Sequence, residues 1–138
     1  MRIVILIFGL AGLISVYLFK MNLFYDPWEN FIPSDLQPFP LIDQPWLYII
    51  GKYIRFFLND LFMFFIVYTL YPNKATVNSG LIILSFGGLV LLPLYLILSM
   101  NPSDSSIHFL HHLHRITMNP ILMMLLIPAL YLHRIRLL

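Results

Sequence analysis

The chain has 138 residues, of which 60% are hydrophobic, 16% aromatic and only 10% charged. A soluble domain carries roughly 25% charged residues, and a chain this short has a large surface for its volume, so the composition excludes an ordinary water-soluble domain. Cysteine is absent, which excludes disulfides, thiolate catalysis and cysteine-ligated metals. The formal net charge of +2 comes from few ionisable groups and gives no indication of a nucleic-acid partner. We therefore expect an all-α, multi-pass membrane protein whose apolar surface faces membrane lipid.

Four apolar windows predict four transmembrane helices in one small bundle that occupies residues 1–138 as a single domain. Each window offers about the 20 mostly apolar residues that a membrane span requires. The windows cover about residues 3–20, 46–71, 79–100 and 119–136. A cleaved signal peptide is the alternative for the first window, and the absence of a small-x-small site before Lys20 favours an uncleaved helix.

Prolines predict local irregularities in the last two helices. Pro93 and Pro128 fall inside apolar windows, where proline usually kinks a helix. The pair Asn119-Pro120 is typical of an N-cap followed by proline at the first helical position. We therefore expect the fourth helix to begin at Asn119 and to bend near its middle.

The positions of lysine and arginine predict the orientation of the bundle. With four spans, the side that holds both termini carries Arg2, Lys74, Arg134 and Arg136. The opposite side carries Lys20 and Arg115, with Lys52 added if the second helix begins late. Because cytoplasmic loops carry the excess of positive charge, both termini are expected in the cytoplasm, in a bacterial inner membrane. Residues 22–45 and 101–118 would then form two outer loops.

The first outer loop, residues 22–45, has an unusual composition. It has a formal charge of −4 with no lysine or arginine, and it holds five of the ten prolines. Proline blocks regular backbone pairing, and aromatic side chains prefer the headgroup level, so this loop is expected to fold down onto the bilayer surface. The contact residues expected in it are Tyr25, Asp26, Trp28 and Glu29.

The second helix carries polar residues on one face. Lys52, Arg55 and Asn59 follow the spacing i, i+3 and i+7, which places them within about 60° of one another around a helix, and Asp60 lies nearby. Ionisable groups at membrane depth indicate an internal polar site. The alternative is that the second helix begins later in the sequence and that the side chains of Lys52 and Arg55 extend to the lipid headgroups. Asn59 and Asp60 are too short for that.

The second outer loop contains the run His108-Phe109-Leu110-His111-His112-Leu113-His114-Arg115. Its letters match one histidine box of membrane di-iron desaturases, in which His108, His111 and His112 would be the metal ligands. Such enzymes need several boxes, whereas this chain has five histidines in total, so we expect neither a metal nor another cofactor. His108, His111, His112 and Arg115 are expected to contact the acidic first loop. Opposite charges attract strongly near a bilayer, so Asp26 or Glu29 should pair with this segment or with Arg55.

Three ordered motifs together resemble a known family. The first is Leu23-Phe24-Tyr25-Asp26-Pro27, and the second is the stretch from Lys52 to Asn59, KYIRFFLN. The third is His114-Arg115-Ile116 followed by Asn119-Pro120 and by the stretch 125–131, LLIPALY. In this order the chain resembles the exosortase F system-associated membrane proteins of Bacteroidota over nearly its whole length. The chain has Met118-Asn119-Pro120 where a glutamine is expected before the proline.

The resemblance implies an accessory protein that is encoded beside an exosortase, a membrane transpeptidase with a catalytic cysteine. Since this chain has no cysteine, it is not that enzyme, and the expected function is a non-enzymatic role in protein sorting. Two alternatives remain open at this point. One is a small metal- or haem-dependent enzyme that uses the His108–His114 cluster, and the other is a transporter subunit that uses the polar face of the second helix.

Overall fold

The computed structural model describes residues 1–33 and 38–136, and these residues form helices and connecting segments without strands. The first two helices are α1 (Arg2–Leu23) and α2 (Pro45–Leu70). The third pass consists of α3 (Lys74–Phe86), a π-helical turn η1 (Gly87–Leu91) and α4 (Leu92–Met100). The last pass consists of α5 (Ile107–Met118), α6 (Ile121–Met124) and α7 (Leu126–Arg136).

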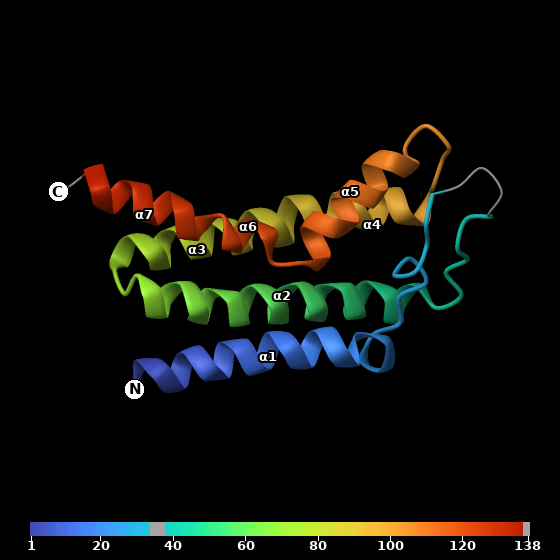
Figure 1. Cartoon of the computed structure of the whole chain (residues 1–138). Helices are drawn as coiled ribbons and strands as arrows, with labels where there is room; N and C mark the ends of the chain where they lie inside the picture. Colours follow the sequence, from blue (N-terminus) through green and yellow to red (C-terminus); the bar gives the residue numbers. More distant parts are fainter. Residues whose placement is uncertain (34–37, 137–138) are drawn as a thin grey trace.

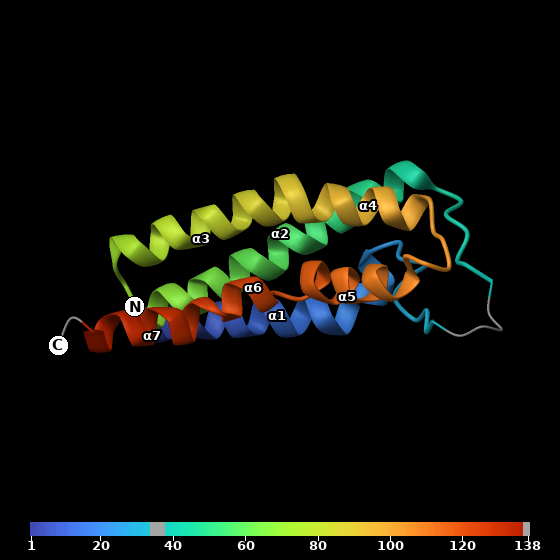
Figure 2. The ribbon, with the colours of Figure 1, turned by 90° about the horizontal axis from the view of Figure 1, so that it is seen from above.

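The chain runs back and forth four times along one axis, as Figures 1 and 2 show. Both termini and the α2–α3 turn lie at one end, called here the termini end, and the connections α1–α2 and α4–α5 lie at the other, the loop end. Three helical passes are long and apolar enough to cross a membrane, and α5 with α6–α7 forms a fourth candidate bent by 61°. The expected all-α membrane bundle is therefore confirmed.

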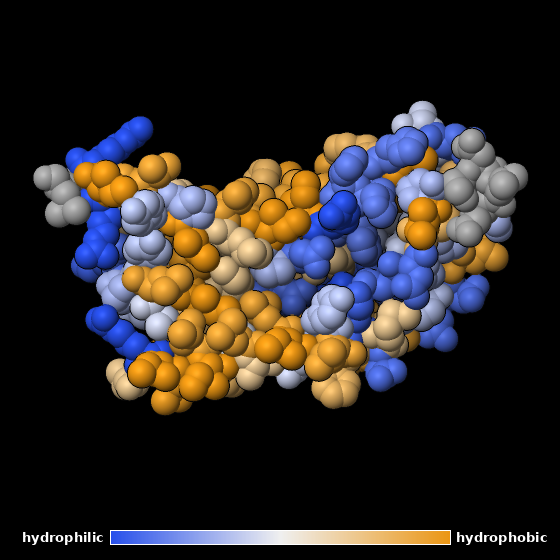
Figure 3. Space-filling model, viewed as in Figure 1, coloured by the Kyte–Doolittle hydropathy of each residue, from blue (hydrophilic) through white to orange (hydrophobic). Residues whose placement is uncertain are grey.

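The outer surface of the bundle suits a lipid environment. Large apolar side chains of α1, among them Ile3, Ile7 and Leu18, are more than half exposed. Figure 3 shows hydrophobic residues along the edge where α1 lies and hydrophilic residues gathered toward the loop end. Burying these apolar side chains in acyl chains removes them from water, which is the dominant favourable term for such surfaces.

Two glycines let α1 approach α2 closely. A Cβ atom added to Gly9 would lie 2.9 Å from the backbone oxygen of Phe62, and one added to Gly12 would lie 2.4 Å from the Phe62 ring. Small residues at such contacts allow helix backbones in membranes to pack tightly. This packing brings Lys20, in the last turn of α1, beside the polar face of α2.

The prediction that residues 101–118 form a loop is wrong in one respect, because most of these residues form the helix α5. Ile107, Leu110, Leu113 and Thr117 are buried at helical spacing, whereas His108 and other polar residues between them are exposed. This is an amphipathic helix whose apolar stripe packs against the bundle. The interleaved histidines lower the average hydropathy of the segment, so a search for continuous apolar windows passes over it.

The proline positions mark irregularities, but not all at the expected residues. The π-helical turn η1 ends two residues before Pro93, and the α6–α7 break lies at Leu125, three residues before Pro128. The expectation that Asn119 caps the fourth helix is wrong. Asn119 instead ends α5 in an extended conformation, which is the conformation preferred before proline, and Pro120 directly precedes α6.

Candidate functional site

The polar face of α2 points into the bundle at the loop end. The side chains of Lys52, Arg55, Asn59 and Asp60 are all buried, with Lys52 only 1% exposed and Arg55 5% exposed. The alternative in which Lys52 and Arg55 reach outward to the headgroups is therefore wrong for this structure. Both cations turn inward because the segment between α1 and α2 brings carboxylates to them.

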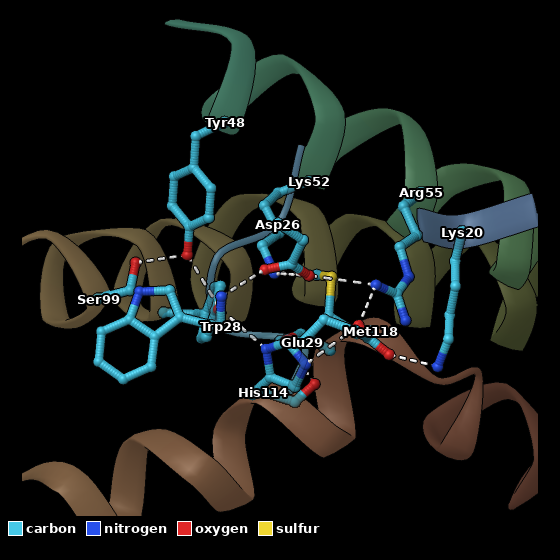
Figure 4. A network of polar contacts seen from close by, with 12 residues as sticks. Lys20, Asp26, Trp28, Glu29, Tyr48, Lys52, Arg55, Ser99, His114 and Met118 are labelled. Carbon is cyan, nitrogen blue, oxygen red and sulfur yellow. Dashed lines mark hydrogen bonds and ion pairs between the residues drawn. The ribbon is translucent and has the colours of Figure 1, made fainter. Parts of the chain in front are cut away.

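Asp26 is the central acceptor of this site. Its Oδ2 atom lies 2.5 Å from Lys52 Nζ and 3.2 Å from Arg55 Nη1, as Figure 4 shows. Its Oδ1 atom accepts a hydrogen bond of 3.1 Å from the backbone N–H of Trp28, the local turn that aspartate commonly forms with the residue two positions on. The turn and the ion pairs together hold the segment 24–31 against α2.

Glu29 joins three elements to the same segment. Its carboxylate accepts from Arg55 Nη1 at 2.5 Å and from Lys20 of α1, and it lies 3.7 Å from His114 Nε2 of α5. Burial alone would raise the pKa of Glu29, but the contacts with His114, Arg55 and Lys20 outweigh burial and hold this pKa well below its usual range. Glu29 is therefore a permanent anion in the folded protein at neutral pH.

A line of hydrogen-bonding groups continues from His114 across the bundle. His114 Nδ1 lies 2.9 Å from the Tyr95 hydroxyl, which lies 3.0 Å from the Tyr48 hydroxyl. The Tyr48 hydroxyl lies 3.0 Å from Ser99 Oγ. The line links α5, α4 and α2, so the carboxylates of the first segment are connected to groups on every pass of the bundle.

The charges of the site nearly balance. We call Lys20, Asp26, Glu29, Lys52, Arg55 and His114 the ionic network. Its ion pairs join three cations to two carboxylates, which leaves one surplus positive charge when His114 is neutral. The ammonium of Lys52 also lies 5.0 Å from the centre of the Tyr95 ring, and such a cation–π contact adds stabilisation where water is excluded.

The other residues expected at the site lie around this network. Asn59 donates a 2.7 Å hydrogen bond to the Met118 carbonyl, so it ties α2 to the end of α5. Asp60 is buried, and no ion pair in the described part of the chain includes it. The Tyr25 hydroxyl accepts from the backbone N–H of Asp43 at 3.1 Å. Trp28 is buried and packs edge-on against Phe31 at 5.1 Å between ring centres.

The histidine run does not converge on one point. His108, His112 and Arg115 are exposed, and the rings of His111 and His112 lie 6.3 Å apart. Within residues 1–33 and 38–136, three potential ligand atoms come within 4.8 Å of one another at Asp26, Glu29 and His114. A metal there would have to displace the cations already paired with both carboxylates, so these residues do not fit a metal centre.

Several residues of the site were not expected from the sequence. They are Lys20, Tyr48, Tyr95 and Ser99, and His114 was expected only as one member of the His108–Arg115 segment. A usable signal exists for His114, because it lies four residues after Leu110 and seven after Ile107, on the apolar stripe of α5. A similar signal exists for Tyr48, which lies one helical turn before Lys52 on the same face of α2.

The site can hold charge and fix the segment 24–31 on the bundle, since its acids are already matched by buried cations. The pairing expected between the first loop and either Arg55 or the histidine segment is present, through Arg55 and His114. Comparison with family models, with curated proteins and with solved structures finds no match to this chain.

Proposed function

We propose that the chain is a non-enzymatic accessory protein of an exosortase-type protein-sorting system. In this role the bundle anchors a fixed outer surface in the bacterial inner membrane and presents it to a membrane-embedded partner. The three sequence motifs described above motivate the choice of partner. The structural support is the ionic network. In it, the carboxylates of Asp26 and Glu29 form ion pairs that hold the segment 24–31 in one place.

A fixed segment gives a partner a surface of defined shape. Asp26 and Glu29 hold the segment to α1, α2 and α5 at once. A surface that is already ordered loses less conformational entropy on binding than a mobile loop would. This observation carries the proposal, since a loop that only connected two helices would not need two buried carboxylates.

The loop end also displays apolar side chains that a partner can cover. Leu41 is 81% exposed, Trp46 77% and Phe109 54%. Aromatic residues are enriched where one protein contacts another, and a few of them usually supply most of the binding energy. Leu41 lies in the α1–α2 connection, Trp46 in the first turn of α2 and Phe109 in α5.

The proposed orientation places both termini in the cytoplasm. Arg2, Lys74, Arg134 and Arg136 lie in segments at the termini end (Figure 1). An excess of lysine and arginine favours the cytoplasmic side of a membrane. The loop end would then face outward, where an exosortase acts on the tails of exported proteins.

Reporter fusions test this orientation. A reporter that is active only in the cytoplasm should give a signal after residue 74 and at the C-terminus, and none after residue 104. A reporter that is active only after export should give the reverse pattern. An exported signal at the C-terminus would refute the orientation.

Co-purification tests the partner. The tagged chain, expressed with an exosortase from the same genome and extracted in mild detergent, should retain the exosortase. Replacing Phe109 by serine should reduce recovery about tenfold, because loss of a central aromatic contact costs roughly 1.4 kcal/mol or more. Tyr131→Ser is the matched control, since Tyr131 is 55% exposed but lies on α7, toward the other end. Absence of the exosortase from the intact wild-type preparation would refute the proposal.

A further inference from the structure

A cavity of about 180 Å³ lies beside the ionic network, between α1, α2 and the link that joins α5 to α6. Its α1 wall includes Val16 and Tyr17, its α2 wall includes Arg55 and Asn59, and Asn119 of the link contributes a third side. One wall is therefore mainly apolar and the other two carry hydrogen-bonding groups. Figure 3 shows hydrophilic residues reaching from the loop end toward the middle of the molecule.

Arg55 lines this cavity, and its guanidinium keeps hydrogen-bonding capacity that the ion pairs do not use. Its hydrogen bonds to Asp26 and Glu29 both use Nη1. The Nε atom is buried and has no hydrogen-bond partner in the described part of the chain. A buried donor without a partner costs about 1–3 kcal/mol. The Nε–Nη2 edge is a planar fork, which matches two oxygens of a phosphate or carboxylate group.

The charge of the site also favours an anion. The ionic network holds three cations and two carboxylates, and a buried surplus charge is costly in a medium of low dielectric constant. One bound anion would bring the count to balance. Arg55 is the network residue that lines the cavity, so the surplus charge is available at the place where the anion would bind.

The cavity lies at a level where lipid headgroups can reach it. Tyr17 is 66% exposed, and the ammonium of Lys20 lies 4.8 Å from the centre of the Tyr17 ring near the end of α1. Tyrosine and lysine at a helix end are typical of the membrane–water interface. Asn119, on the other side of the cavity, is exposed as well.

We propose that this cavity binds the phosphate group of an anionic lipid headgroup, held by the free edge of Arg55 beside Asn119. Inorganic phosphate has the same binding chemistry. The apolar wall on α1 favours the lipid, because its acyl chains can stay in the bilayer against α1 while its phosphate enters. The bound headgroup would make lipid part of the surface next to the segment 24–31.

Lipid retention by charge-altered variants tests this proposal. The protein is placed in phosphatidylcholine nanodiscs that contain a small fraction of phosphatidylglycerol, and bound lipid is measured by native mass spectrometry. Asn119→Asp puts a carboxylate at the rim and should weaken phosphatidylglycerol binding on the order of tenfold or more, because like charges in contact repel strongly.

Asn101→Asp is a closely matched control. Both asparagines follow the end of a helix and donate from Nδ2 to the carbonyl four residues earlier, Asn119 at 3.0 Å and Asn101 at 3.3 Å. Asn101 does not line the cavity, so its variant should bind phosphatidylglycerol like the wild type. Equal binding by Asn119→Asp and the wild type would overturn the site.

A competition arm separates the two sources of phosphate. Excess inorganic phosphate should displace little phosphatidylglycerol if the acyl chains contribute to binding. Displacement by inorganic phosphate together with no preference for phosphatidylglycerol over phosphatidylcholine would overturn the lipid assignment. Retention of phosphatidylglycerol that Arg55→Gln abolishes, in a variant with unchanged helical circular dichroism, would support it.

Discussion

Replacing Asp26 by alanine is expected to lower the free energy of unfolding by about 3–5 kcal/mol, the usual cost of breaking a buried ion pair by removing one partner. The reason is that Lys52 and Arg55 stay buried on α2 after their shared acceptor is lost. Thermal unfolding in detergent micelles, followed by circular dichroism, measures the change. The segment 24–31 should also become accessible to proteases in this variant.

Asp43→Ala is the control, because Asp43 belongs to the same connecting segment but is exposed. Its backbone N–H, which donates to the Tyr25 hydroxyl, is kept in the variant. The double variant Asp26→Ala, Lys52→Met should recover part of the lost stability, since one of the two unpaired cations is then removed as well. An Asp26→Ala variant as stable as Asp43→Ala would contradict the buried ion pairs.

Much of the fold can be predicted from the sequence because apolar length alone identifies a membrane span. The windows 3–20, 46–71 and 79–100 correspond closely to α1, α2 and the α3–α4 pass. The helix α5 cannot be found in this way, because it is short and half of its residues are polar. It is stable only through the stripe that it packs against α4 and α2, which is a tertiary effect.

The candidate site is predictable on α2 and much less so elsewhere. Helical spacing places Lys52, Arg55 and Asn59 on one face without any knowledge of the partners. Which carboxylates meet them depends on how the 24–31 segment folds back, and nothing local in the sequence determines that. Which of the four histidines faces the network depends on how α5 is rotated against the bundle. The four look equivalent in the sequence until the apolar stripe of α5 is considered, and that stripe identifies His114.

The depth of the site is a further point where local reasoning is insufficient. At 1.5 Å per residue Arg55 lies about 13 Å along α2 from Trp46, which suggests a position deep in the bilayer. However, Arg55 shares the carboxylate of Glu29 with Lys20, at the polar end of α1. Arg55, nine residues beyond Trp46 on α2, therefore lies near the last turn of α1. Arg55 is thus buried inside the bundle but close to the polar end of α1, which reduces the free-energy cost of burying the charges of the network.

Glu29→Gln is expected to show a stability loss that depends on pH. Contacts with His114, Arg55 and Lys20 hold the pKa of Glu29 below its ordinary value despite burial, whereas the unfolded value is about 4.3. A lowered folded pKa contributes stability that is fully present above the unfolded value and is lost as pH falls below it. The wild type should therefore exceed Glu29→Gln by about 2–3 kcal/mol at pH 7, typical of hydrogen bonds to a charged group.

The difference should shrink steadily below about pH 4, because the unfolded wild-type chain then gains a proton that the folded one resists. Paired melting curves of the two proteins between neutral and acid pH provide the measurement. Asp104→Asn serves as the control, since Asp104 is exposed in the α4–α5 connection and its loss should matter little at any pH. A Glu29→Gln deficit that stays constant down to pH 3 would mean that packing, and not the carboxylate charge, holds the segment 24–31 on the bundle.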